Sequence, residues 1–273
     1  QGYLYVDAGQ TLTIEKGCRI YVHADAPVIV DGTLKVNGEK NTVDRVYFQG
    51  DRLDEPYKDF PAAWPGIYFR TPSKDNLLNY AVIKNSFQAV AVEDPSPNAN
   101  PKLTLNQCVT DNSYENGIIA LNSSIIANNC LISNCGKNIA IGKGGSYQFT
   151  HCTVVSYSNF FIQHKEPVLT LNDDNGSSPL DATFLNCIFW GENESLENEV
   201  IVDKKGSSGV VTFQNVLWRL KTAPSNVTID PAAINNLDPQ FDSIDVAKQY
   251  YDFRLSKRIS PAVDAGNNNS LVI

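Results

Sequence analysis

The chain of 273 residues contains no methionine, only three histidines and three tryptophans, and no long apolar run. A membrane-spanning helix needs roughly 18 or more consecutive apolar residues, so we expect no membrane span. Because the chain holds no methionine, it does not begin at a translation start, and we expect that an export signal was removed ahead of Gln1. The sequence therefore favours a secreted or cell-surface protein.

Positive charge is also scarce. The chain carries 22 Lys and Arg residues against 30 Asp and Glu residues, which gives a formal net charge of −8. Binding to nucleic acid depends on clustered basic side chains that displace counterions, so we expect no nucleic-acid partner. Hydrophobic residues make up 42% of the chain and charged residues 19%, a composition that supports a folded core and argues against disorder.

The six cysteines include no C-x-x-C pair, and the three histidines lack the spacing of metal ligands. Both absences argue against a structural zinc site. Cys108, Cys130 and Cys152 are instead separated by 22 and 22 residues, and each closes a similar phrase, such as Leu103-Thr-Leu-Asn-Gln-Cys108. The cysteines thus belong to an internal repeat.

Six copies of this phrase end in a small or medium residue. An apolar column lies three residues before that end, and the residue just before the end is mainly polar. We expect the two apolar columns to be buried and the polar column to point outward along an extended strand. The end positions are Ala81, Cys108, Cys130, Cys152, Cys187 and Val216, and the polar column is Tyr80, Gln107, Asn129, His151, Asn186 and Asn215.

A fixed period of about 20 to 30 residues is typical of a solenoid. The sequence predicts an all-β fold, a single-stranded right-handed parallel β-helix of about ten coils over residues 1–236. Residues 237–273 are expected to cap the open end of the same domain. The cysteines of the repeat then form an interior stack of small apolar side chains.

Three insertions interrupt the repeat and are expected to emerge from its turns, where solenoids often bind partners. The spacing from Cys152 to Cys187 rises to 35 residues, and this longest insertion includes 164–167 and 172–176. A second insertion carries Glu192, Glu194, Glu197 and Glu199, and we expect a solvated, charge-extended turn. The third is the proline-rich stretch 93–101.

Parts of the chain are similar to known bacterial proteins. The stretches 9–17, 30–38 and 64–69 resemble the first coils of right-handed parallel β-helix proteins of the pectin-lyase-like group. The tail, with Leu237-Asp-Pro-Gln-Phe241 and 260–266, resembles the choice-of-anchor β-helix proteins that bacteria export to the cell surface. This resemblance implies the fold and an exported location, but no single activity, because the group includes lyases, hydrolases, epimerases and adhesins.

The catalytic patterns of that group fit poorly. No Gly-His-Gly occurs, and no Asp column recurs at coil spacing. One local cluster remains, in which Lys165 or His164 removes a sugar-ring proton while Asp173 and Asp174 hold calcium. The alternative is that 172–176 simply makes a turn.

Exposed aromatic side chains offer a second kind of site, because flat rings stack on the C–H faces of sugars. The candidate contacts are Tyr114, Tyr157, Trp190 and Trp218, and His151 is a further candidate from the polar column. Trp190 and Trp218 follow equivalent strands and are expected to be neighbours across coils. The leading hypothesis is a monomer that recognises polysaccharide along the side of the solenoid. A calcium-assisted polysaccharide lyase and a structural or adhesive surface module are the alternatives.

Overall fold

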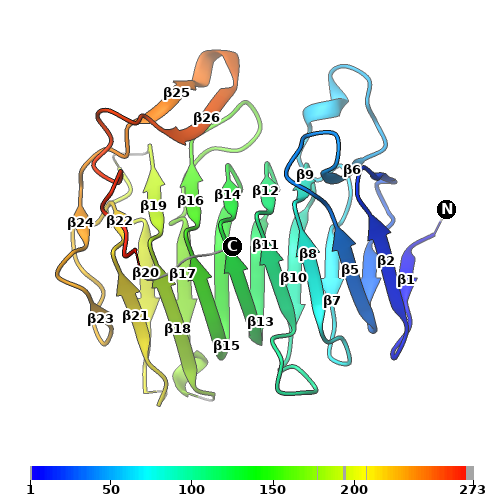
Figure 1. The fold of residues 1–273 in the computed structure, drawn as a ribbon, viewed down its shortest axis with the longest axis horizontal. Coiled ribbons are helices and arrows are strands. Elements are labelled where there is room, and N and C mark those ends of the chain that lie inside the picture. The colour runs from blue at the N-terminus through cyan, green and yellow to red at the C-terminus, as the bar shows by residue number, and fades with distance from the viewer. Residues whose placement is uncertain (1, 177, 193–194, 207, 269–273) are drawn as a thin grey trace.

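A computed structural model describes residues 2–176, 178–192, 195–206 and 208–268, and these residues form a parallel β-helix (Figure 1). Each coil contributes up to three short strands, one to each of three faces. The sheet of the third face contains nine parallel strands, one from each coil, so the described strands form nine coils. This is close to the predicted number of about ten. The predicted fold class is thus confirmed.

The strands of the first two faces belong to one sheet, since β13 (Asn116–Asn128) and β15 (Lys137–Thr150) run through both faces without a break. The first face also contains β1 (Leu4–Val6), β4 (Val28–Val30), β7 (Ile67–Phe69), β10 (Gln88–Glu93), β17 (Leu169–Asn172) and β20 (Val200–Asp203). The second contains β2 (Thr11–Glu15), β5 (Thr33–Asn37), β8 (Asn76–Asn79), β11 (Leu103–Asn106), β18 (Leu180–Leu185), β21 (Val211–Gln214) and β23 (Thr228–Ile229).

The third face is a separate sheet. Its strands are β3 (Arg19–Val22), β6 (Val46–Gly50), β9 (Ala81–Lys84), β12 (Val109–Asp111), β14 (Leu131–Ser133), β16 (Thr153–Ser156), β19 (Ile188–Gly191), β22 (Leu217–Trp218) and β24 (Ile234–Asn235). Among the described residues, the helices are three 3₁₀ turns at Tyr57–Asp59, Asp174–Gly176 and Val246–Lys248. Within the described ranges, no helix has the length and apolar character that a membrane span requires.

The cysteine repeat lies inside the solenoid, as predicted. Cys108, Cys130, Cys152 and Cys187 are each at most 4% exposed, and none forms a disulfide. Each thiol donates to a carbonyl of the preceding coil, and the four acceptors belong to the buried apolar column Leu78, Leu105, Ala127 and Phe149. Equivalent cysteines on successive coils therefore make equivalent hydrogen bonds, each to the coil before it.

The polar column, predicted to lie along an extended strand, forms a corner instead. Its six members have φ between 48° and 56° and form a left-handed corner between the second and third faces. Asparagine tolerates this conformation better than most residues, which explains its recurrence here. His151 is one of these corner residues, and its backbone N–H donates to Leu185 of the next coil.

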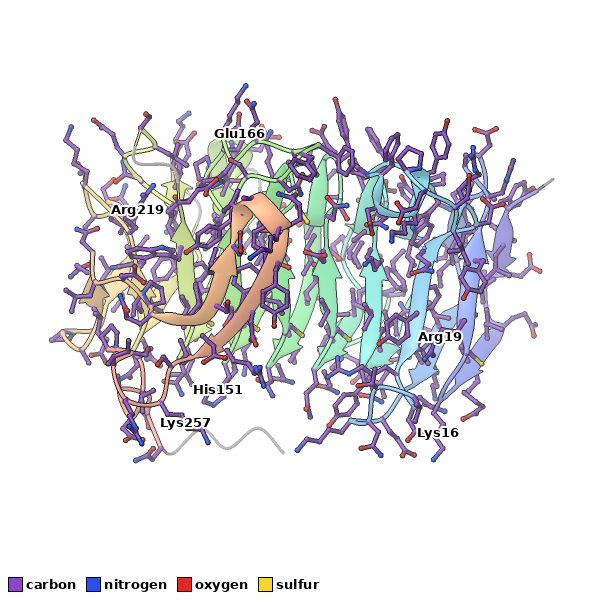
Figure 2. The ribbon with its side chains drawn as sticks, turned by 90° about the horizontal axis from the view of Figure 1, so that it is seen from above. Lys16, Arg19, His151, Glu166, Arg219 and Lys257 are labelled. Carbon is purple, nitrogen blue, oxygen red and sulfur yellow. The ribbon has the colours of Figure 1, made fainter. Side chains whose placement is uncertain are left out.

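The C-terminal segment lies along the sides of the coils. Strands β25 (Phe241–Asp245) and β26 (Tyr250–Leu255) form an antiparallel hairpin above the third face. Figure 2 shows this hairpin between His151 on one side and Glu166 and Arg219 on the other. The residues after it run along the left-handed corner, where Asn267 exchanges hydrogen bonds with Asn186 and Ala265 accepts one from Asn215. Its described part thus packs along the coils, from the third face to the left-handed corner.

Candidate functional site

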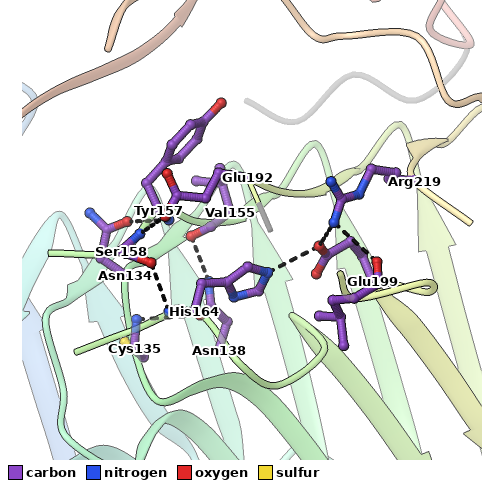
Figure 3. A network of polar contacts seen from close by, with 11 residues as sticks. Asn134, Cys135, Asn138, Val155, Tyr157, Ser158, His164, Glu192, Glu199 and Arg219 are labelled. Atoms are coloured by element: carbon purple, nitrogen blue, oxygen red, sulfur yellow. Dashed lines mark hydrogen bonds and ion pairs between the residues drawn. The ribbon is translucent and has the colours of Figure 1, made fainter. Parts of the chain in front are cut away.

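The predicted catalytic histidine is buried in a charged network (Figure 3). His164 Nε2 lies 3.0 Å from Glu199 Oε1, and Arg219 contacts the same oxygen at 3.0 Å. The side chains of His164 and Glu199 are 1% and 0% exposed, and that of Arg219 is 16% exposed. The network thus joins residues from three different coils at the corner between the third and first faces.

Gly191, at the end of β19, makes this network possible. A Cβ atom at this position would lie 2.1 Å from His164 Nε2 and 2.3 Å from Glu199 Oε1, far inside contact distance. A larger residue would therefore separate the histidine from the carboxylate. The histidine and the carboxylate are closed to solvent, so we assign the network a structural role in which buried charges are paired.

This arrangement corrects the prediction of a His164 and Lys165 pair. His164 is buried, whereas Lys165, the next residue, is exposed. Strand β17 separates both from Asp173 and Asp174, which lie at the opposite corner of the same coil. The four predicted residues therefore do not form one site.

The predicted calcium ligands have other roles. Asp173 is fully buried, and its Oδ2 accepts hydrogen bonds from the backbone N–H groups of Lys205 at 2.8 Å and Gly206 at 3.1 Å. Asp174 is exposed in a 3₁₀ turn. The carboxylate of Asp173 thus fastens the loop of the next coil. This supports the alternative that residues 172–176 simply make a turn. No three His, Cys, Asp or Glu side chains are grouped as metal ligands in the described part of the chain.

The acidic loop also differs from the expected solvated turn. Glu199 lies in the buried network, and Glu192 accepts a hydrogen bond from the backbone of Ser158. Only Glu197 behaves as expected, because it is exposed and pairs with Lys221. Glu194 lies outside the described residues.

The two tryptophans are not neighbours across coils. Trp218 is in register with Phe189, and Trp190 is in register with Val155. Because alternate residues of a strand point to opposite faces, this offset of one residue turns Trp218 inward. Trp218 is 0% exposed and packs on Phe213, so the prediction that its ring contacts sugar is wrong.

Trp190 is half-buried, with the guanidinium of Arg219 5.9 Å from the centre of its ring. Tyr157 lies under the C-terminal hairpin. The centre of its ring is 6.3 Å from that of Tyr251 and 6.0 Å from that of Phe253. Burial raises the pKa of Tyr157 to about 12. The ring of Tyr157 thus helps to hold the hairpin on the coils.

A groove that the sequence did not predict lies at the corner between the third and first faces. Its volume is about 480 Å³, within the usual range of small-molecule sites. Its walls are the loop of residues 51–63, the loop of residues 157–168 and the tip of the C-terminal hairpin. We call it the corner groove.

Asparagine side chains hold the walls of the corner groove in place. Asn85 Nδ2 donates to the carbonyl of Lys58 at 2.7 Å, and Asn112 Nδ2 donates to that of Asp59 at 2.9 Å. Asn112 also accepts a hydrogen bond from Asn159 at 3.0 Å, so one amide fastens both loops. These bonds organise the groove before any ligand arrives, which lowers the entropic cost of binding.

The groove presents aromatic rings to solvent. Phe160 is 73% exposed and Phe161 is 41% exposed, and both line the groove. Phe161 packs on Phe60 of the loop of residues 51–63, with ring centres 4.9 Å apart. Phe60 in turn packs on Tyr57, with ring centres 5.2 Å apart. Phe160 forms no such ring pair among the described residues, although its backbone N–H donates to Gln249 of the hairpin. The ring of Phe160 is thus more accessible to a ligand than the ring of Phe161.

Asp111 supplies the half-buried carboxyl group of the groove, at the end of β12. Burial raises the pKa of Asp111, although a hydrogen bond of 2.8 Å from Ser133 and the nearby Lys84 charge act in the opposite direction. The folded state therefore binds this proton more tightly than the unfolded state. The stability that Asp111 contributes is present below its unfolded pKa of about 3.9 and is lost as the pH rises through its folded pKa.

We therefore expect Asp111→Asn to gain stability relative to the wild type as the pH rises from about 4 to 7. Urea denaturation of both proteins at several pH values measures this difference. A difference that stays constant, or that favours the wild type at higher pH, would contradict the effect of burial on Asp111.

A signal for this groove was present in the repeat. Asn85, Asn112 and Asn134 each lie four residues after an end position of the phrase, namely Ala81, Cys108 and Cys130. All three have positive φ and form a second left-handed corner. The aromatic residues of the loops carry no such pattern, because the loops lie outside the repeat.

No family model, no curated protein and no solved structure matches this chain. The parallel β-helix is therefore established from the strand pairing alone, and a function has to be argued from the chemistry of the site.

Proposed function

We propose that this protein binds a polysaccharide in the corner groove, as a monomer at or near the bacterial cell surface. The observation that carries the proposal is the position of Phe160 and Phe161, whose exposed rings line an open groove next to polar side chains. Aromatic rings stack on the C–H faces of pyranose sugars. Amide, carboxyl and ammonium groups form hydrogen bonds with the hydroxyls.

The charges of the groove favour a neutral chain. Glu55, Asp59 and Asp111 line it together with Lys84 and Lys248. Carboxylates thus outnumber ammonium groups, in a protein whose formal net charge is already −8. A polymer of uronic acids would meet repulsion here, whereas a neutral glycan would not.

The resemblance of the first coils to the pectin-lyase-like group, and of the tail to choice-of-anchor proteins, supports a role with glycans outside the cytoplasm. The proposal concerns binding. Strand β17 separates the predicted catalytic residues His164 and Lys165 from the predicted calcium ligands Asp173 and Asp174, so these four residues do not support the calcium-assisted lyase.

Native gel electrophoresis through soluble polysaccharides tests this function. The panel consists of xyloglucan, mixed-linkage β-glucan, arabinoxylan, galactomannan and polygalacturonate. We expect at least one neutral polymer to retard the wild-type protein. We expect Phe160→Ala to weaken binding about two- to tenfold, the range that an aromatic contact of about 0.5–1.5 kcal/mol gives.

Tyr21→Ala is the matched control, because Tyr21 is an aromatic residue, 48% exposed, on the first coil and outside the corner groove. This variant should bind like the wild type. Absence of retardation by every polymer would refute glycan binding. Equal retardation of Phe160→Ala and wild type would remove the corner groove as its site.

A further inference from the structure

A pair of exposed aromatic rings lies beside the corner groove. Phe87 is 40% exposed and Tyr114 is 52% exposed. Their ring centres are 6.0 Å apart, with planes inclined by 24°, so the two rings stack along the axis of the solenoid. Neither residue lines the corner groove.

The backbone fixes the position of this pair. Tyr114 N–H donates to Ser86 and Phe87 N–H donates to Trp64, so Pro65, Phe87 and Tyr114 occupy equivalent positions on successive coils. Gly136 N–H donates to Ser113, which makes Gly136 the next member of the same column. The rings thus follow from the coil register and not from a mobile loop.

The column lies next to the asparagines that anchor the groove. Asn85 and Asn112 precede Phe87 and Tyr114 by two residues, and the residues between them, Ser86 and Ser113, are fully buried with their hydroxyls 2.8 Å apart. A buried serine column therefore separates the exposed ring column from the asparagine column, which the loop of residues 51–63 covers. The corner groove and the ring pair are adjacent parts of one surface.

The coil next to Tyr114 carries no side chain in this column. Its residue is Gly136, where a Cβ atom would lie 2.3 Å from the carbonyl oxygen of Tyr114. Tyr114 is 52% exposed and Phe87 is 40% exposed, so the side chain of Tyr114 is the more accessible of the two. An exposed aromatic ring can stack on a flat apolar partner.

We propose that Phe87 and Tyr114 form a second contact site for the same glycan, a stacking platform for a neutral pyranose ring that extends the corner groove around the edge of the solenoid. This inference rests on the proposed function. It predicts that the protein prefers long chains over short ones, because only a chain of several sugars reaches both the groove and the platform. Two linked contacts raise the affinity for a ligand that spans them.

Calorimetric titration with two lengths of ligand tests the platform. The probes are cellobiose and cellohexaose, xylobiose and xylohexaose, and mannobiose and mannohexaose. We expect Tyr114→Ala and Phe87→Ala to weaken binding of the best hexasaccharide about two- to tenfold, with no change for its disaccharide in the groove. Tyr114→Phe retains the ring and should bind as the wild type does.

The outcomes separate the two proposals. If Phe160→Ala weakens hexasaccharide binding while Phe87→Ala and Tyr114→Ala do not, the platform is refuted and the corner groove stands. If none of the six probes binds and no polymer retards the wild type, glycan binding itself fails, and the platform with it. A loss in Tyr114→Phe equal to that in Tyr114→Ala would refute ring stacking.

Discussion

Glu199→Ala should destabilise the fold by about 3–5 kcal/mol, the usual cost of removing one partner from a buried ion pair. Glu199 Oε1 is the shared acceptor of His164 and Arg219, and the glutamate side chain is completely buried. Without the carboxylate, His164 and Arg219 both lose the acceptor that Glu199 Oε1 provides, at a position that is itself 0% exposed. Urea denaturation followed by far-ultraviolet circular dichroism measures the change.

Glu197→Ala provides the matched control from the same loop. Its carboxylate pairs with Lys221, and both side chains are at least 60% exposed. Surface pairs of this kind contribute about 0–1 kcal/mol, so this variant should unfold almost as the wild type does. Similar losses in Glu197→Ala and Glu199→Ala would show that burial does not distinguish the two glutamates, contrary to the structure.

Cys130→Asp should cost several kcal/mol and is expected to reduce soluble expression. Cys130 is 4% exposed in the interior stack, between Cys108 and Cys152 of the neighbouring coils. A carboxylate at this position would be buried without a partner of opposite charge, which is among the most destabilising changes in a protein core. The yield of soluble protein and the urea midpoint measure the effect.

Cys130→Ala keeps an apolar side chain at the same position and tests whether the charge or the lost thiol is responsible. Its cost should be much smaller, because the weak S–H donor and one sulfur atom are all that is removed. Cys18 is half-buried, so Cys18→Asp should also be tolerated better than Cys130→Asp. Equal stability of Cys130→Asp and wild type would contradict the interior stack.

The candidate site was predictable only in part. The insertion after Cys152 was recognised as a loop, and one of its ends does form a wall of the corner groove. The sequence predicts a catalytic role for His164 because it stands beside Lys165, but adjacency along a chain does not determine which side chain is buried. Its true partners, Glu199 and Arg219, are 35 and 55 positions away.

The sequence spacing of the two tryptophans also did not show which ring would be buried. Trp190 is three positions after Cys187, and Trp218 is two positions after Val216. On a strand, a difference of one position decides between interior and surface. The register of β19 and β22 therefore buried one ring and left the other half-exposed.

The amino-acid sequence by itself determined the stacked coils and the buried cysteine column, because an apolar pattern repeated at a fixed interval can be satisfied only when equivalent positions lie above one another. It could not determine the corner groove. Asn112 meets Asn159, 47 residues away, and Phe160 meets Gln249, 89 residues away, and both contacts involve the loop of residues 157–168, which does not repeat. Only the tertiary structure brings these residues to the same corner, since their positions depend on how many residues each coil uses before it turns.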